Sequence, residues 1–264
     1  MKQITSLQNP FIKNFLKLRE KSRERKKQAL FIVEGKQEIE LAIKGNYEIN
    51  TLLCITGKFS ADYLQIFNNT DVVEVSQDIY QKIAYRGSAE GLIALVKTKN
   101  LALDIIHFKN KYPLILIAEG IEKPGNIGAI LRTADAADID AVILVDTKTD
   151  VYNPNVIRSS VGAIFTNQIA IANPEETITF LKQNHISIFS ATLQNANHYT
   201  DENYTQASAL VVGAETTGLT KIWRDSAIKN IHIPMQGTID SMNVSVAAAI
   251  LIFEAKRQRQ LQTI

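Results

Sequence analysis

The sequence predicts an α/β protein whose C-terminal part holds a mainly parallel sheet with helices on both faces. Short apolar, β-branched runs recur through this part of the chain, and most of them are separated by segments with helical periodicity. Near-continuous apolar strands that alternate with helices are typical of parallel sheets covered on both faces. The runs lie at residues 114–118, 141–145, 168–171, 186–191, 209–212 and 228–233.

The N-terminal part predicts a second, smaller α/β unit. Residues 9–27 indicate a helix with Pro10 in its first turn, where proline removes no helical hydrogen bond. Residues 35–44 indicate another helix. Strand-like runs lie at residues 29–34, 51–55, 72–75 and 92–96, and a polar stretch follows them. We therefore expect a first domain at residues 1–97, a linker at 98–112 and a second domain at 113–264.

Composition excludes several classes of protein. The chain has 264 residues, of which 45% are hydrophobic and 21% charged, as in an ordinary globular protein. Its one cysteine cannot form an internal disulfide, and its four scattered histidines lack zinc-site spacing, so we expect no metal. The longest apolar run, residues 246–253, is far shorter than the ~20 residues that cross a bilayer. These observations favour a cytoplasmic protein without a membrane segment.

Positive charge is concentrated at the N-terminus. Residues 1–28 contain nine basic and two acidic residues, a net charge of +7, which leaves −5 on the rest of a chain whose total is +2. Such a segment attracts phosphate backbones, although a solvated helix face has the same pattern. An anionic membrane fits less well, because the apolar residues here stay in the first half of the segment. The candidate phosphate-binding side chains are Lys13, Lys17, Arg19, Arg23, Lys26 and Lys27.

Ligands of parallel α/β sheets bind beyond the carboxyl ends of the strands, so the turns that follow the predicted strands are the candidate functional segments. In the first, residues 119–132, Asn126 precedes a predicted helix at 127–138 and Arg132 follows about a turn and a half later. A helix start favours an anion, and arginine can hold a phosphate through two hydrogen bonds. A simple cap and a surface arginine are the alternative.

Two later turns carry further candidates. Residues 212–219 place Gly213 at a strand end and Glu215 in the turn, and residues 233–253 lead into an alanine-rich helix. Taken singly, each polar residue also fits a helix cap or a partner for the helix dipole. Together, polar groups beside methionines predict a partly apolar pocket that suits a nucleoside-like ligand. The residues of the third turn that we single out are Ser241, Asn243, Ser245, Met235 and Met242.

The chain shows none of the common catalytic motifs: it lacks G-x-S-x-G, H-E-x-x-H and a convincing Cys/His pair. The chemistry must then depend on positioning and electrostatics. Methyl transfer from a sulfonium donor fits, because the donor is already activated and the enzyme has only to align an oxygen and help remove its proton.

In their order, these turns resemble the motifs of the SpoU (TrmH) family of RNA ribose 2′-O-methyltransferases, in the SPOUT class. The shared segments are N-x-G-x-x-x-R at residues 126–132, Y-N-P-N-V-I-R-S-S-V-G-A-I-F at 152–165, G-A-E-x-x-G-L at 213–219 and I-P-M-x-G-x-x-D-S-M-N-V-S-V-A-A-A at 233–249. The N-terminal part is similar to the substrate-binding domain often attached to these enzymes, an α/β fold like that of certain RNA-binding ribosomal proteins. Residues 85–91 depart from the Pro-Gln-Gly-like turn of many relatives.

The resemblance implies S-adenosylmethionine as methyl donor, RNA as substrate, a deep trefoil knot in the C-terminal domain and a homodimer formed through the helix at residues 243–260. The cofactor-binding positions that it implies are Thr192, Gly213, Ile233, Met235 and Met242. The catalytic positions are Arg132, with Asn126, Glu215, Ser241 and Asn243 ordering the loops around it, and Ser160 is a weaker candidate.

Arg132 is the residue that the resemblance places at the target ribose. Because a guanidinium resists deprotonation, we expect Arg132 to hold a phosphate and stabilise the developing alkoxide while another group takes the proton. Ribosomal RNA is the expected substrate. Two alternatives stay open: a tRNA 2′-O-methyltransferase of the same family, and a catalytically silent RNA-binding factor of ribosome assembly. The intact catalytic positions argue against the silent protein.

Overall fold

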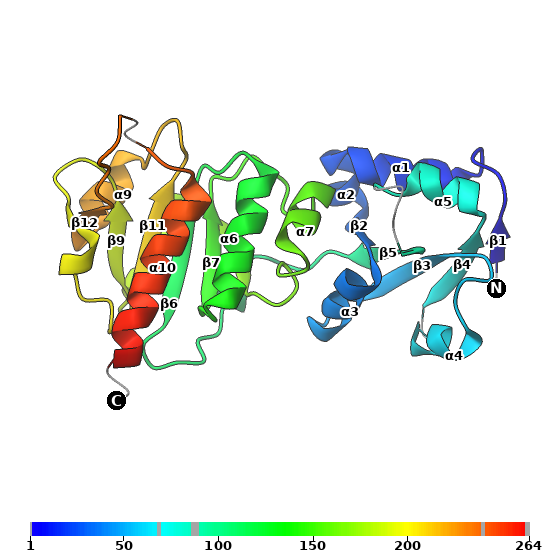
Figure 1. Ribbon diagram of the computed structural model, residues 1–264, viewed down its shortest axis with the longest axis horizontal. Helices are drawn as coiled ribbons and strands as arrows, with labels where there is room; N and C mark the ends of the chain where they lie inside the picture. The colour runs from blue at the N-terminus through cyan, green and yellow to red at the C-terminus, as the bar shows by residue number, and fades with distance from the viewer. Residues whose placement is uncertain (1, 68–69, 86–89, 239–240, 262–264) are drawn as a thin grey trace. The chain divides into compact units, whose positions relative to one another are not determined.

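The computed structural model describes residues 2–67, 70–85, 90–238 and 241–261, and it divides into two compact units (Figure 1). The first unit is Met1–Lys99 together with Asp150–Thr166, and the second is Asn100–Thr149 together with Asn167–Ile264. Both units are α/β, which confirms the predicted fold class. No helix in the described ranges is long and apolar enough to cross a membrane. The trefoil knot stays a prediction.

The described part of the second unit contains a seven-stranded sheet in the order β10-β12-β9-β11-β6-β7-β8, in which neighbouring strands run parallel. The predicted parallel sheet is therefore confirmed, and the six predicted runs all became strands. The two-residue strand β10 was not foreseen, because so short a segment has no readable alternation. The strands are β6 (Leu114–Glu119), β7 (Ala141–Val145), β8 (Ile169–Ala172), β9 (Ser187–Ala191), β10 (Asn197–His198), β11 (Ser208–Gly213) and β12 (Lys229–His232).

Helices cover both faces of this sheet, which explains why its central strands are mostly apolar. All six residues of β6 are buried, and Ile115 and Ile117 pack in one cluster with Leu181 of α8 and Trp223 of α9. Helices α6 and α10 pack against each other beside β7 and β11 (Figure 1). The helices of this unit are α6 (Pro124–Ala136), α8 (Pro174–Gln183), α9 (Lys221–Ser226) and α10 (Val244–Leu261), with short 3-10 turns η2 (Leu103–Ile105) and η3 (Tyr199–Asp201).

Helix α6 begins earlier than the sequence predicted. Its N-cap is Lys123 and Pro124 is its first residue, so Asn126 lies inside the first turn and not near the cap. The N-terminal proline explains the shift, because its fixed φ suits the first helical position and its missing N–H costs nothing there. The Asn126 side chain is consequently available for contacts with other segments.

The described part of the first unit contains a five-stranded mixed sheet in the order β1-β4-β3-β5-β2. Strands β1, β4 and β3 are parallel, and β5 is antiparallel to both β3 and β2. Helices α1 and α5 lie on one side of the sheet and α3 and α4 on the other (Figure 1). The elements are β1 (Lys2–Ile4), β2 (Leu30–Glu34), β3 (Ile49–Ile55), β4 (Asp71–Val75), β5 (Leu92–Lys97), α1 (Pro10–Glu20), α2 (Ser22–Gln28), α3 (Lys36–Lys44), α4 (Ala61–Leu64), η1 (Gln65–Phe67), α5 (Gln77–Ile83) and α7 (Pro154–Ser160).

The single helix predicted at residues 9–27 is two helices, α1 and α2, separated at Lys21. Lys21 has an extended backbone, with φ −116° and ψ 112°. The buried Arg25 explains the break: its Nη1 donates to the carbonyl oxygens of Leu18, at 2.7 Å, and Arg19, at 3.1 Å. A charged side chain therefore satisfies carbonyls that a continuous helix would have bonded internally.

Residues 150–166 pack with the first unit, which differs from the continuous second domain that we expected at 113–264. The ring of Tyr152 stacks on Phe31 at 4.3 Å between centroids, and Phe165 meets Tyr47 edge-on at 5.2 Å. Asp150 Oδ2 accepts a hydrogen bond from Arg25 Nε at 2.6 Å, and these side chains are only 11% and 3% exposed. These buried aromatic contacts pack the segment against the rest of the unit.

Candidate functional site

A cavity of about 440 Å³ lies in the second unit, beyond the carboxyl ends of strands β9, β11 and β12. Its place agrees with the general rule for ligands of parallel sheets. Two of the three turns singled out in the sequence therefore line one cavity. The predicted residues that line it are Thr192, Gly213, Glu215, Ile233, Met235, Ser241 and Met242.

Gly213 is required by the turn that follows β11. The Gly218 N–H donates to the Ala214 carbonyl oxygen at 2.8 Å, so the chain folds back onto residue 213. A Cβ at Gly213 would lie 2.4 Å from the backbone carbon of Gly218 and 2.6 Å from the Leu219 nitrogen. Only glycine fits there, and its backbone faces the cavity without a side chain.

The first of the three turns, which leads into α6, joins the site through a polar network. Asn126 Nδ2 donates to Glu215 Oε1 at 3.2 Å, and Asn243 Nδ2 donates to the same oxygen at 2.7 Å and to Asn126 Oδ1 at 3.1 Å. Lys123 Nζ donates to Glu215 Oε2 at 2.8 Å. The Glu215 carboxylate thus connects all three turns, which are distant along the chain.

The charge of Glu215 is favoured by its surroundings. The hydrogen bond from Lys123 is the main cause that lowers the pKa of Glu215 below its ordinary value, and the hydrogen bond from Asn126 acts in the same direction. The same contact raises the pKa of Lys123. An ionised carboxylate can accept all of these hydrogen bonds at neutral pH, so the network is complete there.

Asn243 also caps helix α10. Its Oδ1 accepts hydrogen bonds from the backbone N–H of Ser245 at 2.9 Å and from Ser245 Oγ at 2.5 Å. The cap and the binding network were competing interpretations of this residue from the sequence. The structure shows that one side chain does both, since its oxygen caps the helix and its nitrogen bonds Glu215 and Asn126.

Arg132 lies apart from this network. It is an exposed residue of α6, and it is not among the described residues that line the 440 Å³ cavity. It follows Asn126 by six positions, which turns it to a different face of the helix. Within the described ranges its guanidinium makes no hydrogen bond or ion pair. Its donors are therefore available to a ligand.

The sequence reasoning missed three residues of this site. Lys123 pairs with Glu215, and Arg224 lines the cavity while its Nη1 donates to the Leu219 carbonyl oxygen at 2.5 Å. Glu119, which is 4% exposed, accepts from the N–H and the hydroxyl of Thr220 at 2.8 and 2.6 Å and so holds the turn after Gly213. Glu119 gave a usable signal, because a carboxylate at the end of a fully apolar strand needs a partner.

The candidate RNA-binding side chains of the first unit are mostly exposed. Five of the six, on α1 and α2, are exposed, whereas Arg19 is partly buried and donates to the carbonyl oxygens of Lys82 and Ile83, each at 3.2 Å. Arg19 therefore has a structural role that the charge pattern did not reveal. Among the residues that the structure describes, no group of three or more His, Cys, Asp or Glu side chains could hold a metal ion.

The chain is therefore an α/β protein of two units, one with a mixed sheet and one with a parallel sheet. The parallel sheet has a cavity at its strand ends, where α/β proteins of this kind bind their ligands. The chain belongs to the SpoU rRNA methylase family, whose model matches residues 113–253. An MRM3-like substrate binding domain matches residues 9–94. Both matches confirm the resemblance drawn from the sequence.

Individual relatives resemble the chain over nearly its whole length. It is 28% identical over 256 residues to the 23S rRNA (guanosine(2553)-2'-O)-methyltransferase RlmP of Bacillus subtilis, which covers 97% of this chain and 100% of that protein. A crystal structure of an RNA 2'-O ribose methyltransferase has 37% identity and a TM-score of 0.82, covering 98% of this chain and 99% of that one. The AdoMet-bound rRNA methyltransferase of Sinorhizobium meliloti has 27% identity and a TM-score of 0.89, covering 97% of each chain.

Proposed function

We propose that the protein transfers a methyl group from S-adenosylmethionine to a ribose 2′-hydroxyl of ribosomal RNA. The observation that carries this proposal is the 440 Å³ cavity beyond the strand ends, which is bordered by Gly213 and by the network around Glu215. Family membership and the rRNA 2'-O-methyltransferase names of full-length relatives support the same reaction. The cytoplasmic location stays a prediction.

The residues of the cavity fit the proposed cofactor. Ile233, Met235 and Met242 offer apolar surface, and the hydroxyls of Thr192 and Ser241 offer hydrogen bonds, a mixture that suits a nucleoside. Lacking a side chain, Gly213 leaves its backbone open to contact. When bound, S-adenosylmethionine supplies a methyl group already activated on a sulfonium.

The polar network around Glu215 would position the turns that hold this ligand. One Glu215 oxygen accepts hydrogen bonds from both Asn126 and Asn243, so a displacement of one turn would shift the positions of the other two. The network would therefore hold the cavity in its binding conformation before S-adenosylmethionine binds. Such preorganisation reduces the entropy lost on binding.

Arg132 would act at the target ribose. Its free guanidinium can hold the phosphate beside the ribose and stabilise the oxygen as its proton leaves for another acceptor, since the guanidinium itself does not deprotonate. Because Arg132 does not line the cavity of its own chain, we propose that it serves the cavity of a second copy in a homodimer. Val246 and Phe253 of α10, which are 49% and 51% exposed, are the proposed apolar part of that interface.

The first unit would bind the RNA. Exposed basic side chains on α1 and α2 can contact phosphates, which supply affinity and positioning but no sequence information. The match of residues 9–94 to a substrate-binding domain supports this role.

The direct test compares RNA from cells with and without the gene by mapping 2′-O-methylated nucleotides. Loss of one methylated position in ribosomal RNA, restored by the purified protein with S-adenosylmethionine, is the expected result. Loss of a position in tRNA instead would replace the proposed substrate by the tRNA alternative. RNA binding with unchanged methylation in every RNA would identify a silent assembly factor and contradict the proposed reaction.

A further inference from the structure

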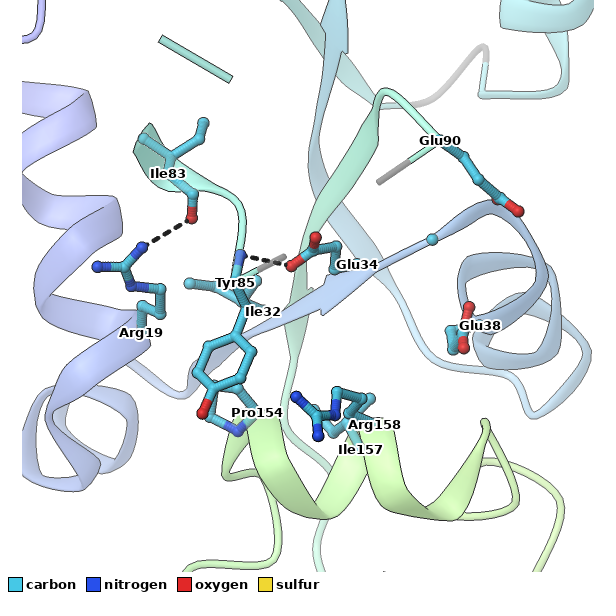
Figure 2. Close-up of a pocket in the computed structure, with 11 residues that line it drawn as sticks. Arg19, Ile32, Glu34, Glu38, Ile83, Tyr85, Glu90, Pro154, Ile157 and Arg158 are labelled. Atoms are coloured by element: carbon cyan, nitrogen blue, oxygen red, sulfur yellow. Dashed lines mark hydrogen bonds between the residues drawn. The ribbon is translucent and has the colours of Figure 1, made fainter. Parts of the chain in front are cut away.

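The first unit contains a cavity of about 200 Å³ that plays no part in the proposed methyl transfer (Figure 2). Its walls come from four separate parts of that unit: α1, the β2–α3 junction, the three residues Ile83, Tyr85 and Glu90, and helix α7. Apolar surface comes from Ile32, Ile83, Pro154 and Ile157. The walls combine this apolar surface with charged side chains.

Tyr85 is fixed at the cavity with much of its ring still exposed. Its hydroxyl donates to Asn155 Oδ1 at 2.8 Å, and its backbone N–H donates to a Glu34 carboxylate oxygen at 2.8 Å. The Arg158 guanidinium lies 5.7 Å from the ring centroid (Figure 2). Even so, the residue is 43% exposed. A large aromatic ring that is held in place without being buried is suited to stack on an unpaired base.

Two charged side chains of the cavity have unused hydrogen-bonding capacity. Three carboxylates line it, but Glu34 holds the Tyr85 N–H and Glu90 accepts from the Lys36 N–H at 2.7 Å. Within the described ranges the Glu38 carboxylate has no hydrogen bond, and neither does the guanidinium of Arg158. The cavity therefore presents two carboxylate oxygens of Glu38 as acceptors and the guanidinium N–H groups of Arg158 as donors, and these two side chains are not bonded to each other.

Guanine matches this combination. Its N1–H and N2–H groups form a pair of donors that one carboxylate can accept, and its O6 and N7 form a pair of acceptors that an arginine can bind with two hydrogen bonds. Uracil has no exocyclic amino group and lacks the acceptor pair of a purine. The chemistry of Glu38 and Arg158 thus selects a guanine over a uracil.

We propose that the cavity between Tyr85, Glu38 and Arg158 binds an unpaired guanine base of the RNA substrate, with the base stacked on Tyr85. The proposal rests on the proposed function for RNA being the ligand, and it adds a site of base recognition to the phosphate contacts of α1 and α2. It assigns sequence selection to the first unit.

The test measures binding of two RNA heptamers, UUUGUUU and UUUUUUU, to the full-length protein by fluorescence anisotropy. The wild type is expected to prefer the guanine-containing heptamer about tenfold, as one bidentate base contact provides. Tyr85→Ala should lower affinity for that heptamer at least about fivefold, because the base no longer stacks on the ring. Glu38→Gln should remove the preference while leaving affinity for oligouridine unchanged. Tyr112→Ala is the matched control, because Tyr112 is 40% exposed beneath the Lys111 ammonium but lies outside this cavity.

Equal binding of the two heptamers by the wild type would overturn the proposal, and so would an unchanged preference in both Tyr85→Ala and Glu38→Gln. Equal decreases in affinity in Tyr112→Ala and Tyr85→Ala would also overturn it, because they would indicate nonspecific stacking. Methylation of ribosomal RNA is measured separately. A wild type that methylates without preferring guanine therefore refutes only this site, whereas a protein that neither binds nor methylates RNA refutes the proposed function as well.

Discussion

The two units assemble their cavities in different ways. In the second unit, the cavity and the network around Glu215 are built from turns that all leave the same edge of one parallel sheet. In the first unit, the cavity at Tyr85 needs helix α7, which follows that part of the chain by more than fifty residues and packs on it through buried contacts. The topology of the parallel sheet brings the residues of the cavity in the second unit together, whereas packing between remote segments forms the cavity in the first unit.

The largest expected effect is a loss of stability, from a substitution that disrupts the packing of the first unit. Asp150→Ala would leave the Arg25 guanidinium buried without its carboxylate, which typically costs about 3–5 kcal/mol of unfolding free energy. Urea unfolding of the full chain measures the decrease. Asp225→Ala is the control, because the Lys221–Asp225 pair has side chains 79% and 58% exposed and should contribute less than about 1 kcal/mol. Similar decreases in the two variants would contradict the assigned role of the buried pair.

The next effect separates binding from chemistry in the second unit. Arg132→Ala should reduce methyl transfer by ~10²–10³-fold, the typical effect of removing one electrostatic donor. Affinity for S-adenosylmethionine should stay unchanged, because the proposed contacts of Arg132 are to the RNA phosphate and ribose and not to the cofactor. Arg132→Lys should also be impaired, since an ammonium cannot form the two-pronged contact of a guanidinium. Near-normal turnover in either variant would show that the assignment is wrong.

A smaller effect tests whether RNA affinity resides in the first unit. Reversing the charge of Lys26 and Lys27 to glutamate should weaken RNA binding and reduce the slope of log affinity against log salt by about one for each phosphate that is no longer neutralised. Filter binding at several salt concentrations provides the slope. The control is Lys182→Glu, an exposed position of α8 in the second unit, which should leave the slope unchanged. An unchanged slope in the Lys26 and Lys27 variant would place the RNA elsewhere.

The smallest effect concerns pH. Because the folded protein lowers the pKa of Glu215 below its ordinary 4.5, the stabilisation from its contacts is complete above that value and is lost as pH falls through the lowered pKa. Cofactor affinity should therefore be flat at neutral pH and decline in strongly acidic buffer. Glu215→Gln should lack that acid-dependent part of the decline. Identical pH profiles for the variant and the wild type would show that Glu215 does not order the cavity.

Sequence reasoning predicted the second unit better than the first. Apolar runs located its six longer strands, and strand-end logic located Gly213, Glu215 and Met242 at one cavity, because a parallel sheet brings strand ends together. The split of the predicted N-terminal helix at Lys21 was not predictable, because it depends on Arg25 reaching back to the carbonyl oxygens of Leu18 and Arg19.

Contacts between segments that are remote along the chain could not be predicted from local sequence patterns either. The packing of residues 150–166 on the first unit depends on aromatic rings such as Phe31 and Tyr152, which are far apart along the chain. The position of Arg132 outside the cavity of its own chain reflects the face of α6 from which it projects. A motif indicated the residue types, but only the fold shows which cavity each one can reach.

The most direct measurement of the central claim is a calorimetric titration of the protein with S-adenosylmethionine. The wild type and Gly237→Ala should bind one molecule per chain, because a Cβ at Gly237 meets nothing within 4 Å. Gly213→Ala should weaken binding at least about tenfold, since its Cβ would collide with backbone at the cavity edge, where close packing tolerates little shift. Thermal unfolding of each variant verifies that it is folded. A wild type without binding, or a folded Gly213→Ala that binds as the wild type does, would contradict the claim.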